Sequence, residues 1–589
     1  MQTSSYISAS NIFACILSLT LALPASAACQ QSQDKSPFEY KEVYLPENID
    51  QRASSAEGMN NVDYDWGLWG HHLSKAIGKD APENDYSLVD GIRNHDQYCF
   101  TSEDTYNRIC NYILDNFGDG SQAQCRFAIF PEDNELACTC KACRDAGNTK
   151  GNATPAMTLL INRLAARFPK HMFFTSSYLS TATVPSIKLA PNAGVIISAM
   201  DFPLSPGNSA IPEKFSNKID SWKKVCNRIY IWDYINNFDD YFTPFPVLNA
   251  FSNRLQYYAS EGVKGVFLNG SGNSYSTFSG LNWYVLNRLL RNPDAKPQEL
   301  MSEYFKKFFP SSGKVLLSYC ESIESNAASR HKKFNIYGGI SDELKEYLVA
   351  PEFFKLYNSF PALISKAKGL EKNRLEKLYS ALSFTALEIM RHSDNGSSDK
   401  SYKMGIMKEL GKCASIKDMT SYNESGNLVS EYLEGWKKYI LADHPSNLLR
   451  GSKLHQLTSQ DEDYTDTKIL TDNTFGIPSD YHCGWFVSSL TDTVSFALPI
   501  DPLRKAKKME CSFLHCPQRH YSIPSSVILY INGKKALEVK SQLNEHTGKY
   551  ERIVVGGKVS FENADKAELQ FVKDAAGDKL IGCDEILFY

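Results

Sequence analysis

The sequence predicts an α/β protein: a (β/α)8, TIM-type barrel followed by a helical segment and a C-terminal β-sandwich. Short apolar runs recur between residues 37 and 270 and are nearly continuous, as in parallel strands that helices cover on both faces. From about residue 297 to 445, apolar residues recur at three- and four-residue spacing. Short β-rich runs separated by turns then follow Pro445, which is typical of a sandwich.

Seven runs are the candidate barrel strands. They are PFEYKEVYL (37–45), WGLWGHHL (66–73), FAIF (127–130), HMFFTSSYL (171–179), GVIISAMDF (194–202), NRIYIWDYI (227–235) and GVKGVFLNG (262–270). Because a closed barrel of this type needs eight strands, we expect one strand to be irregular. An open, doubly wound sheet is the alternative. The domain boundaries that we expect are 38–296 for the barrel, 297–447 for a helical domain packed on it, and 448–589 for the sandwich.

The composition limits the classes of function. A chain of 589 residues is long enough for several domains, and its net charge of −4 comes without a basic stripe. Nucleic-acid binding needs such an electrostatic footprint, so we expect no nucleic-acid partner.

The N-terminus predicts export. Residues 12–23 form an apolar run too short to span a bilayer, and the small residues of PASAAC follow it. We expect a signal peptide over residues 1–28, with cleavage after Ala27 or, for a lipoprotein, before Cys29. The protein would then lie at the cell surface, in the outer membrane or in the periplasm. A membrane would be contacted only through the lipid anchor.

The acids after the FAIF strand are the catalytic candidates. Pro131 ends that strand, and Glu132 and Asp133 follow at once. Cleavage of a glycosidic bond needs a proton donor and a group that stabilises the positive anomeric carbon. Successive residues of an extended chain point to opposite sides, so we expect one acid to be catalytic and the other to brace the loop. Solvated loop acids are the competing interpretation.

Polar and aromatic residues at the carboxyl ends of the other strands are the candidate substrate ligands, because these ends meet at one rim of a barrel. They are His71, His72, Tyr178, Asp201, Trp232, Asp233, Tyr234 and Asn269. An aromatic beside a carboxylate suits a sugar ring and its hydroxyls. For Asp233 the competing interpretation is a helix cap or an ion pair.

A CxCxxC cluster follows the acids. With Cys99 as a fourth thiolate, Cys138, Cys140 and Cys143 would hold a structural zinc ion tetrahedrally. Disulfides are the alternative in an exported protein, and they would also draw on Cys110 and Cys125. We expect no cofactor for catalysis itself.

These motifs resemble a known family. WGLWGHHL (66–73), QYCF (97–100), the stretch with PEDN and CxCxxC, and IYIWDYINNFDDYFTPFP (229–246) occur in its order, followed by EGVKGVFLNG (261–270) and WYVLNRLLRNPDAKPQELMSEYF (283–305). The chain resembles domain-of-unknown-function family 4838, which includes glycoside hydrolase family 163-like proteins of Bacteroidetes. The C-terminal part, with KILTDNTFG (468–476) and CGWF (483–486), looks like a galactose-binding-like domain.

The resemblance implies an exported glycoside hydrolase acting on GlcNAc-containing glycans, an endo-β-N-acetylglucosaminidase that uses the substrate's acetamide as nucleophile. The partner would be an oligosaccharide or a glycoprotein glycan, and Asp133 matches the family's acidic position. Asn269 stands where an acid or Gln is more usual, so one alternative is an inactive glycan-binding surface protein. Another is a glycosidase of uronic-acid glycans, for which an Arg or Lys in the pocket would be expected.

Overall fold

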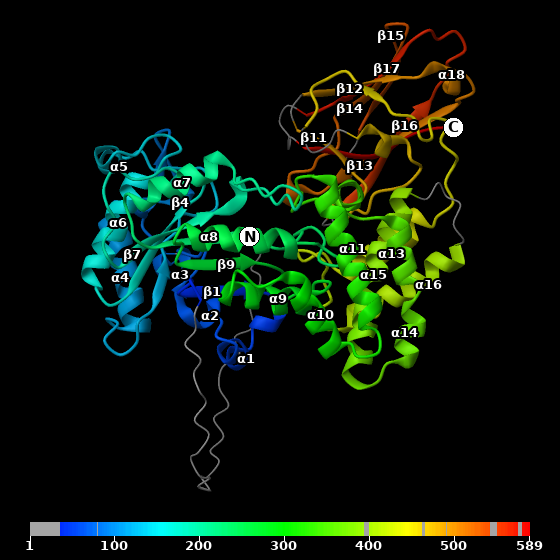
Figure 1. Ribbon diagram of the computed structural model, residues 1–589. Coiled ribbons are helices and arrows are strands. Elements are labelled where there is room, and N and C mark those ends of the chain that lie inside the picture. Colours follow the sequence, from blue (N-terminus) through cyan, green and yellow to red (C-terminus); the bar gives the residue numbers. More distant parts are fainter. Residues whose placement is uncertain are drawn as a thin grey trace, which may run out of the picture. The chain divides into compact units, whose positions relative to one another are not determined.

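The computed structural model describes residues 36–78, 80–393, 400–461, 466–489, 492–541, 550–574 and 580–589. The expected signal peptide and Cys29 lie outside them. Seven parallel strands form one curled sheet (Figure 1). They are β1 (Tyr40–Tyr44), β2 (Trp66–Leu68), β5 (Arg126–Ala128), β6 (Met172–Ser177), β7 (Ala193–Ser198), β8 (Ile229–Tyr234) and β9 (Gly265–Asn269).

The seven predicted strands all occur, and the α/β class is confirmed. The sheet order is β1-β9-β8-β7-β6-β5-β2, with every neighbouring pair parallel. Among the described residues, β1 and β2 do not pair with each other, so the sheet is a curled half-barrel and a closed eight-stranded barrel is not found.

An irregular segment lies beside β1 where an eighth strand would pair. The Lys41 amide donates to Asn60 Oδ1 at 2.9 Å, and the Asn60 amide donates to the Lys41 carbonyl at 2.9 Å. One step along β1, the Val62 amide donates to the Glu42 carboxylate at 3.0 Å. Two short helices, α1 (Gln51–Ala56) and α2 (Val62–Asp65), form the rest of this connection. Side-chain hydrogen bonds therefore replace part of a strand ladder here, and no periodic pattern in the sequence marks them.

Aromatic side chains fill the space inside the curl. Tyr40 stacks on Tyr230 with ring centroids 5.6 Å apart, and Trp66 reaches across to Tyr230 at 6.4 Å and Phe174 at 5.2 Å. A methyl group added at Gly265 would lie 2.6 Å from the Tyr230 ring, so glycine is required where this ring crosses the sheet. The interior is thus a packed core, and any site must lie at its end.

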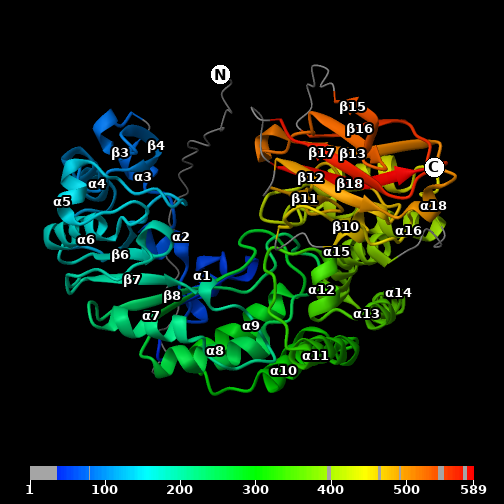
Figure 2. The same cartoon turned by 90° about the horizontal axis from the view of Figure 1, so that it is seen from above.

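Helices cover the outside of the sheet (Figure 2). α6 packs on β6 and β7, α7 on β8, and α9 on β1. The helices of this layer are α4 (Glu103–Phe117), α6 (Thr154–Arg167), α7 (Glu213–Lys223), α8 (Leu248–Ser260) and α9 (Ser279–Arg291). Further elements that were not predicted lie in this part of the chain: the short helix α3 (Ser74–Ile77), the hairpin of β3 (Tyr86–Val89) and β4 (Ile92–Tyr98), and the helix α5 (Lys141–Ala146).

The segment after α9 is helical. Its helices are α10 (Pro297–Phe308), α11 (Gly313–Arg330), α12 (Ile340–Glu346), α13 (Ala350–Tyr357), α14 (Phe360–Lys366), α15 (Gly369–Ser393), α16 (Lys400–Leu410) and α17 (Val429–Gly435). Their buried side chains continue the hydrophobic core of the helices around the sheet. Within the described ranges, none of the helices is both long enough and apolar enough to cross a membrane.

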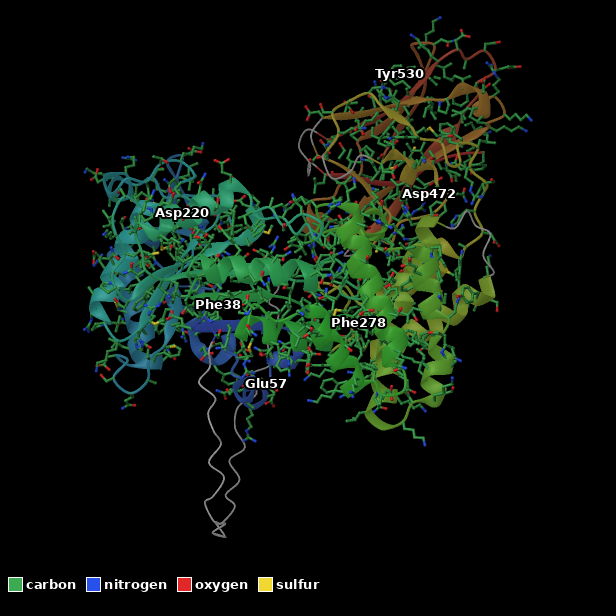
Figure 3. All side chains as sticks on the ribbon, viewed as in Figure 1. Phe38, Glu57, Asp220, Phe278, Asp472 and Tyr530 are labelled. Atoms are coloured by element: carbon green, nitrogen blue, oxygen red, sulfur yellow. The ribbon has the colours of Figure 1, made fainter. Side chains whose placement is uncertain are left out.

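Two antiparallel sheets with their own hydrophobic core follow. One sheet has the order β10-β12-β17-β14-β15 and the other β11-β18-β13-β16. The strands are β10 (His455–Gln456), β11 (Phe486–Ser488), β12 (Thr493–Leu498), β13 (Lys508–His515), β14 (Ser526–Ile531), β15 (Lys534–Lys540), β16 (Glu551–Lys558), β17 (Ala567–Val572) and β18 (Ile581–Phe588), with the short helix α18 (Ile500–Leu503) between β12 and β13. Figure 3 labels Asp472 and Tyr530 in this part of the chain. The three domain boundaries stay predictions.

Candidate functional site

The carboxyl ends of the parallel strands carry a layer of polar and aromatic side chains above the packed interior. Tyr44 of β1 and Tyr234 of β8 are both in register with Asn269 of β9. Because Tyr230, Trp232 and Phe267 belong to the interior cluster, strand alternation turns Tyr234 and Asn269 to the same face. The Ser198 hydroxyl at the end of β7 lies 3.3 Å from the Tyr234 hydroxyl. Two predicted residues, Tyr234 and Asn269, therefore meet at this rim.

An aromatic floor lies beneath this layer. Trp69, which follows β2, stacks on Trp232 with centroids 5.0 Å apart and planes 8° apart. Phe267 packs edge-on against both indoles at 4.7 Å. The indole nitrogen of Trp232 is buried and has no hydrogen-bond partner among the described residues. A flat aromatic surface at this level of the sheet suits stacking of a sugar ring.

Glu132 is half-buried on one side of the acid-bearing loop. The side chain of Gln97 in β4 holds the Glu132 backbone through two hydrogen bonds. The Glu132 amide donates to Gln97 Oε1 at 3.2 Å, and Gln97 Nε2 donates to the Glu132 carbonyl at 3.2 Å. Burial raises the pKa of Glu132, and the nearby His71 and His72 oppose that rise. Its Oε1 is buried without a hydrogen-bond partner within the described ranges. A carboxyl in this state retains its proton to a higher pH than a solvated glutamate.

Asp133 points to a different set of neighbours. It is exposed, and its charge contributes to raising the pKa of Tyr178 and Tyr234 at the strand ends. Asp133 therefore lies near the tyrosines of the rim, whereas Glu132 lies near the two histidines.

His71 ties its own strand end to the acid-bearing loop. Its Nδ1 lies 2.6 Å from the Pro131 carbonyl, which can only accept, so Nδ1 carries the proton. Its ring also lies 6.1 Å from the ring of Tyr178. His72 is exposed, and its Nδ1 contacts the Trp69 carbonyl at 2.9 Å. Both histidines lie near Glu132, and His71 acts there by positioning the loop.

Two predicted ligands are engaged elsewhere. Asp233 is only 1% exposed, because alternation turns it outward into the helix layer. Arg254 of α8 donates to both of its oxygens at 2.8 Å, and the Tyr258 hydroxyl donates at 2.6 Å. Asp201 pairs with Lys214 at 3.0 Å and Lys218 at 2.6 Å. The ion pair considered as the competing interpretation of Asp233 is thus what the structure shows, and neither carboxylate faces the rim.

A third acid reaches the rim from the helical segment. The Glu424 amide donates to the Phe238 carbonyl at 2.8 Å, and the Tyr337 hydroxyl donates to its Oε2 at 3.3 Å. Glu424 is an exposed residue, and partial desolvation of its carboxyl raises its pKa; the Tyr337 hydrogen bond lowers that pKa, and the charges of Asp239 and Asp133 raise it further. No sequence signal identifies Glu424, because it lies in a turn far along the chain from the strands.

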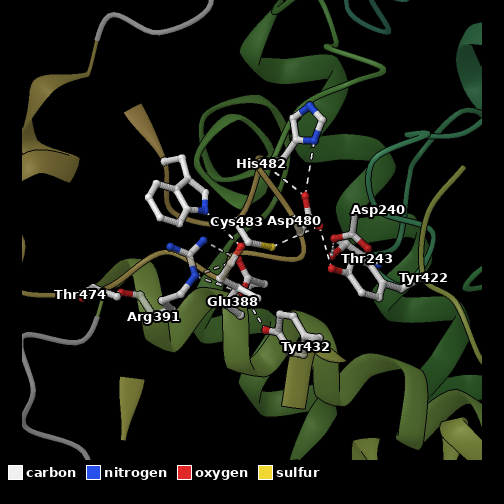
Figure 4. A network of polar contacts seen from close by, with 12 residues as sticks. Asp240, Thr243, Glu388, Arg391, Tyr422, Tyr432, Thr474, Asp480, His482 and Cys483 are labelled. Carbon is white, nitrogen blue, oxygen red and sulfur yellow. Dashed lines mark hydrogen bonds and ion pairs between the residues drawn. The ribbon is translucent and has the colours of Figure 1, made fainter. Parts of the chain in front are cut away.

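The loop after β8 is held by polar contacts from later segments. His482 Nε2 pairs with Asp239 Oδ2 at 2.8 Å, and its Nδ1 lies 3.5 Å from Asp480. Burial alone would lower the pKa of His482, but the hydrogen bonds to Asp239 and Asp480 raise it to about 9. Asp480 also accepts from the Tyr422 hydroxyl at 2.7 Å (Figure 4). The imidazolium therefore binds this loop to the segment that precedes β11.

The four cysteines meet at one point. Their sulfur atoms all lie within 4.8 Å of one another, and this cluster could hold a metal ion. Cys99 Sγ lies 3.7 Å from Cys143 Sγ and 3.8 Å from Cys140 Sγ, and the Leu88 amide of β3 donates to Cys138 Sγ at 3.3 Å. Hydrogen bonds from Cys143 and Cys99 lower the pKa of the Cys138 thiol. These separations are well beyond the S–S bond length of about 2.05 Å.

Comparison with known proteins places the chain in a family. The family described as "Domain of unknown function (DUF4838)" matches residues 22–321. The chain belongs to this family. The recognition of family 4838 from the sequence motifs is thus confirmed, although the family's description assigns no activity.

Comparisons beyond the family are distant. No curated protein matches the chain. A GH138 enzyme targeting pectin rhamnogalacturonan II is similar at 8% identity and a TM-score of 0.31, covering 93% of this chain and 84% of that one. A Paenibacillus sp. cycloisomaltooligosaccharide glucanotransferase complexed with cycloisomaltoheptaose is similar at 8% identity and a TM-score of 0.13, covering 94% and 58%. Scores this low say nothing about the activity of the present DUF4838 protein.

Proposed function

We propose that this DUF4838 protein is a glycoside hydrolase of GlcNAc-containing glycans. The observation that supports the proposal is that two acids from different segments lie close enough for the charge of Asp133 to raise the pKa of Glu424, at the end of the sheet where Trp69 stacks on Trp232. Cleavage of a glycosidic bond commonly uses such a pair of carboxyl groups. The motif resemblance to glycoside hydrolase family 163-like proteins supports the same reaction and an endo-β-N-acetylglucosaminidase specificity.

Glu424 and Asp133 would have different roles in the reaction. Glu424 has a raised pKa and is the general acid that gives its proton to the glycosidic oxygen. Asp133 accepts a hydrogen bond from the acetamide N–H, so that the acetamide oxygen attacks the anomeric carbon. Glu132 is tied to the loop through Gln97 and keeps Asp133 in place. Tyr178, Tyr234 and Asn269 hydrogen-bond the sugar hydroxyls.

The test is glycan release from N-glycoproteins, followed by mass spectrometry of the products. Asp133→Asn lowers the rate by about 10³-fold, within the range expected for loss of a positioned carboxylate. Glu135→Gln is the matched control, because Glu135 is an exposed acid on the same loop. Equal rates in wild type, Asp133→Asn and Glu135→Gln would refute the assignment.

A second candidate is a glycan-binding protein without catalysis, and Asn269 is the observation that favours it. An amide at the rim hydrogen-bonds a sugar but cannot donate a proton as an acid does. Binding of the protein to N-glycans on a glycan array, with no cleavage of these glycans on prolonged incubation, would decide for this candidate.

We also propose that the cysteine cluster holds a structural zinc ion. Four Zn–S bonds of about 2.3 Å in a tetrahedron place the sulfurs about 3.8 Å apart, which agrees with the distances from Cys99 to Cys140 and Cys143. The cluster joins the end of β4 to the start of α5, on either side of the loop that carries Asp133. The ion would therefore stiffen that loop and take no part in the reaction.

Elemental analysis of the purified protein tests the metal. One zinc per chain in wild type and its loss in Cys143→Ser are expected, with Cys226→Ser as the control, since Cys226 is a buried thiol outside the cluster. Cobalt substitution gives the charge-transfer bands of thiolate ligation. A metal-free protein with mass shifts for disulfides would favour the alternative.

Export through residues 1–28 is likewise a proposal. The mass of the mature N-terminus distinguishes cleavage after Ala27 from a lipid-modified Cys29, and an intact N-terminus in the native host would refute export.

A further inference from the structure

A cavity of about 320 Å³ lies beside the candidate site. The segment after β7, from Met200 to Leu204, forms one wall, and residues 333–337 between α11 and α12 form the other. Tyr234 belongs to both the rim and this cavity. Tyr337 also lines the cavity and donates its hydroxyl hydrogen to Glu424. The cavity is therefore joined to the acid-bearing rim through two phenols.

The two charged groups on the inner wall of the cavity, Arg254 and Asp233, form an ion pair with each other. Arg254 lines it, yet its guanidinium binds both oxygens of Asp233 at 2.8 Å and donates to the Phe202 carbonyl at 2.6 Å. It also lies 3.9 Å from the centroid of the Phe202 ring. Since Asp233 neutralises this buried arginine, Arg254 offers a ligand little net charge.

Lys333 is the charged group that remains. It lines the cavity, it is exposed, and it has no ion-pair partner in the part of the chain that the structure describes. Besides Asp233, the other polar groups of the lining are the Asn335 amide, which donates to Asp342 at 3.3 Å, and the phenols of Tyr234 and Tyr337, which contact Ser198 and Glu424. A cation opposite neutral hydrogen-bonding groups is complementary to an anion that also carries hydroxyls.

We propose that this cavity is a subsite for one anionic sugar, adjacent to the bond that the enzyme cleaves; this inference rests on the proposed hydrolase function. Its volume is at the lower end of ligand pockets, which begin near about 300 Å³, so it suits a single sugar unit. A lysine ammonium is a compact point charge without the bidentate geometry of arginine. The subsite therefore selects negative charge and accepts a carboxylate or a sulfate.

Binding is measured apart from cleavage, by ligand-detected NMR on the Asp133→Asn protein. The probes are glucuronate, N-acetylglucosamine 6-sulfate and neutral N-acetylglucosamine. We expect an anionic probe to bind at least about tenfold more tightly than the neutral one, since a hydrogen bond to a charged group is stronger than one between neutral groups. Lys333→Gln removes that preference, and Lys333→Arg retains most of it. Lys332→Gln is the control, because Lys332 is an exposed neighbour that does not line the cavity.

Preference for only one anion identifies the carboxylate or the sulfate as the natural group. Equal binding of all three probes, no binding at millimolar concentration, or a charge preference unaffected by Lys333→Gln overturns the inference. A protein that cleaves neutral glycans but shows no charge preference retains its proposed function and loses the subsite. A protein that binds the anions through Lys333 yet cleaves nothing retains the subsite and loses the hydrolase.

Discussion

The loop after β5 and the loop after β8 are held in different ways. The loop after β5, which carries Glu132 and Asp133, is fixed by groups from residues 71–143: Gln97, His71 and the cysteine cluster. The loop after β8 is fixed by segments that come later. Its Phe238 amide donates to the Ile336 carbonyl at 2.7 Å, and its Tyr241 amide donates to the Tyr422 carbonyl at 2.7 Å.

This contrast shows that the candidate site is not a property of the sheet alone. One acid comes from a strand end and the other from a turn that the helical segment supplies. Variants of each part show whether both contribute equally to catalysis, and whether the loop after β5 can become more mobile without the loop after β8.

The largest expected effect is on catalysis. Glu424→Gln lowers kcat by about 10² to 10⁴-fold, as Asp133→Asn does, because each half of the rim supplies one of the two carboxyl groups. The measurement is initial glycan release at saturating substrate. Ser425→Ala, an exposed neighbour in the same turn, is the control. Normal turnover in Glu424→Gln would mean that the catalytic carboxyl groups lie on the loop after β5 alone.

Loss of the cysteine cluster is expected to increase the mobility of the loop after β5 and not that of the loop after β8. Cys143→Ser removes one ligand of the proposed zinc and lowers the free energy of unfolding by about 3 kcal/mol or more, because metal binding and local folding are coupled. Hydrogen exchange of residues 131–146 rises, while that of residues 236–243 stays as in wild type. Faster exchange in both loops would mean that they are not independent.

Replacing His482 is the converse experiment. His482→Gln removes the cation between Asp239 and Asp480 and costs about 2–3 kcal/mol of stability. The folded-state pKa of about 9 lies above the ordinary histidine value, so this contribution is complete below pH 6.5. It is lost as the pH rises through 9. Denaturation of both proteins at pH 6 and pH 10 checks this, and an unchanged stability difference would contradict the pairing.

The smallest effect is expected at Tyr337. Tyr337→Phe removes the hydrogen bond that lowers the pKa of Glu424, so that pKa rises further and the alkaline limb of the rate profile moves to higher pH. The rate near neutral pH changes only about two- to threefold, since one hydrogen bond is worth about 0.5–1.5 kcal/mol. Movement of the limb to lower pH would show that Glu424 is not the titrating acid.

The sequence could predict the strands because each is a short apolar run followed by a turn. It could also predict the cysteine cluster, because three of its four cysteines lie within six residues. It could not predict the orientation of Asp233, since a one-residue difference in strand phase decides between the rim and the helix layer. Glu424, Tyr337 and His482 were missed because their roles arise from long-range packing that no local pattern encodes. Trp69 was visible as an aromatic, but its stacking on Trp232 depends on the curl of the sheet.

Glu42, whose carboxylate accepts from Val62 where the sheet stays open, has a consequence for the thermodynamics of the whole chain. Burial raises its pKa to about 8, whereas an unfolded glutamate titrates near 4.5. At neutral pH Glu42 therefore takes up about one proton as the chain folds, and its contribution to stability declines as the pH rises from 4.5 to 8. The heat of unfolding in a calorimeter will accordingly vary with the ionisation enthalpy of the buffer, and Glu42→Gln will reduce that variation by the share that Glu42 contributes.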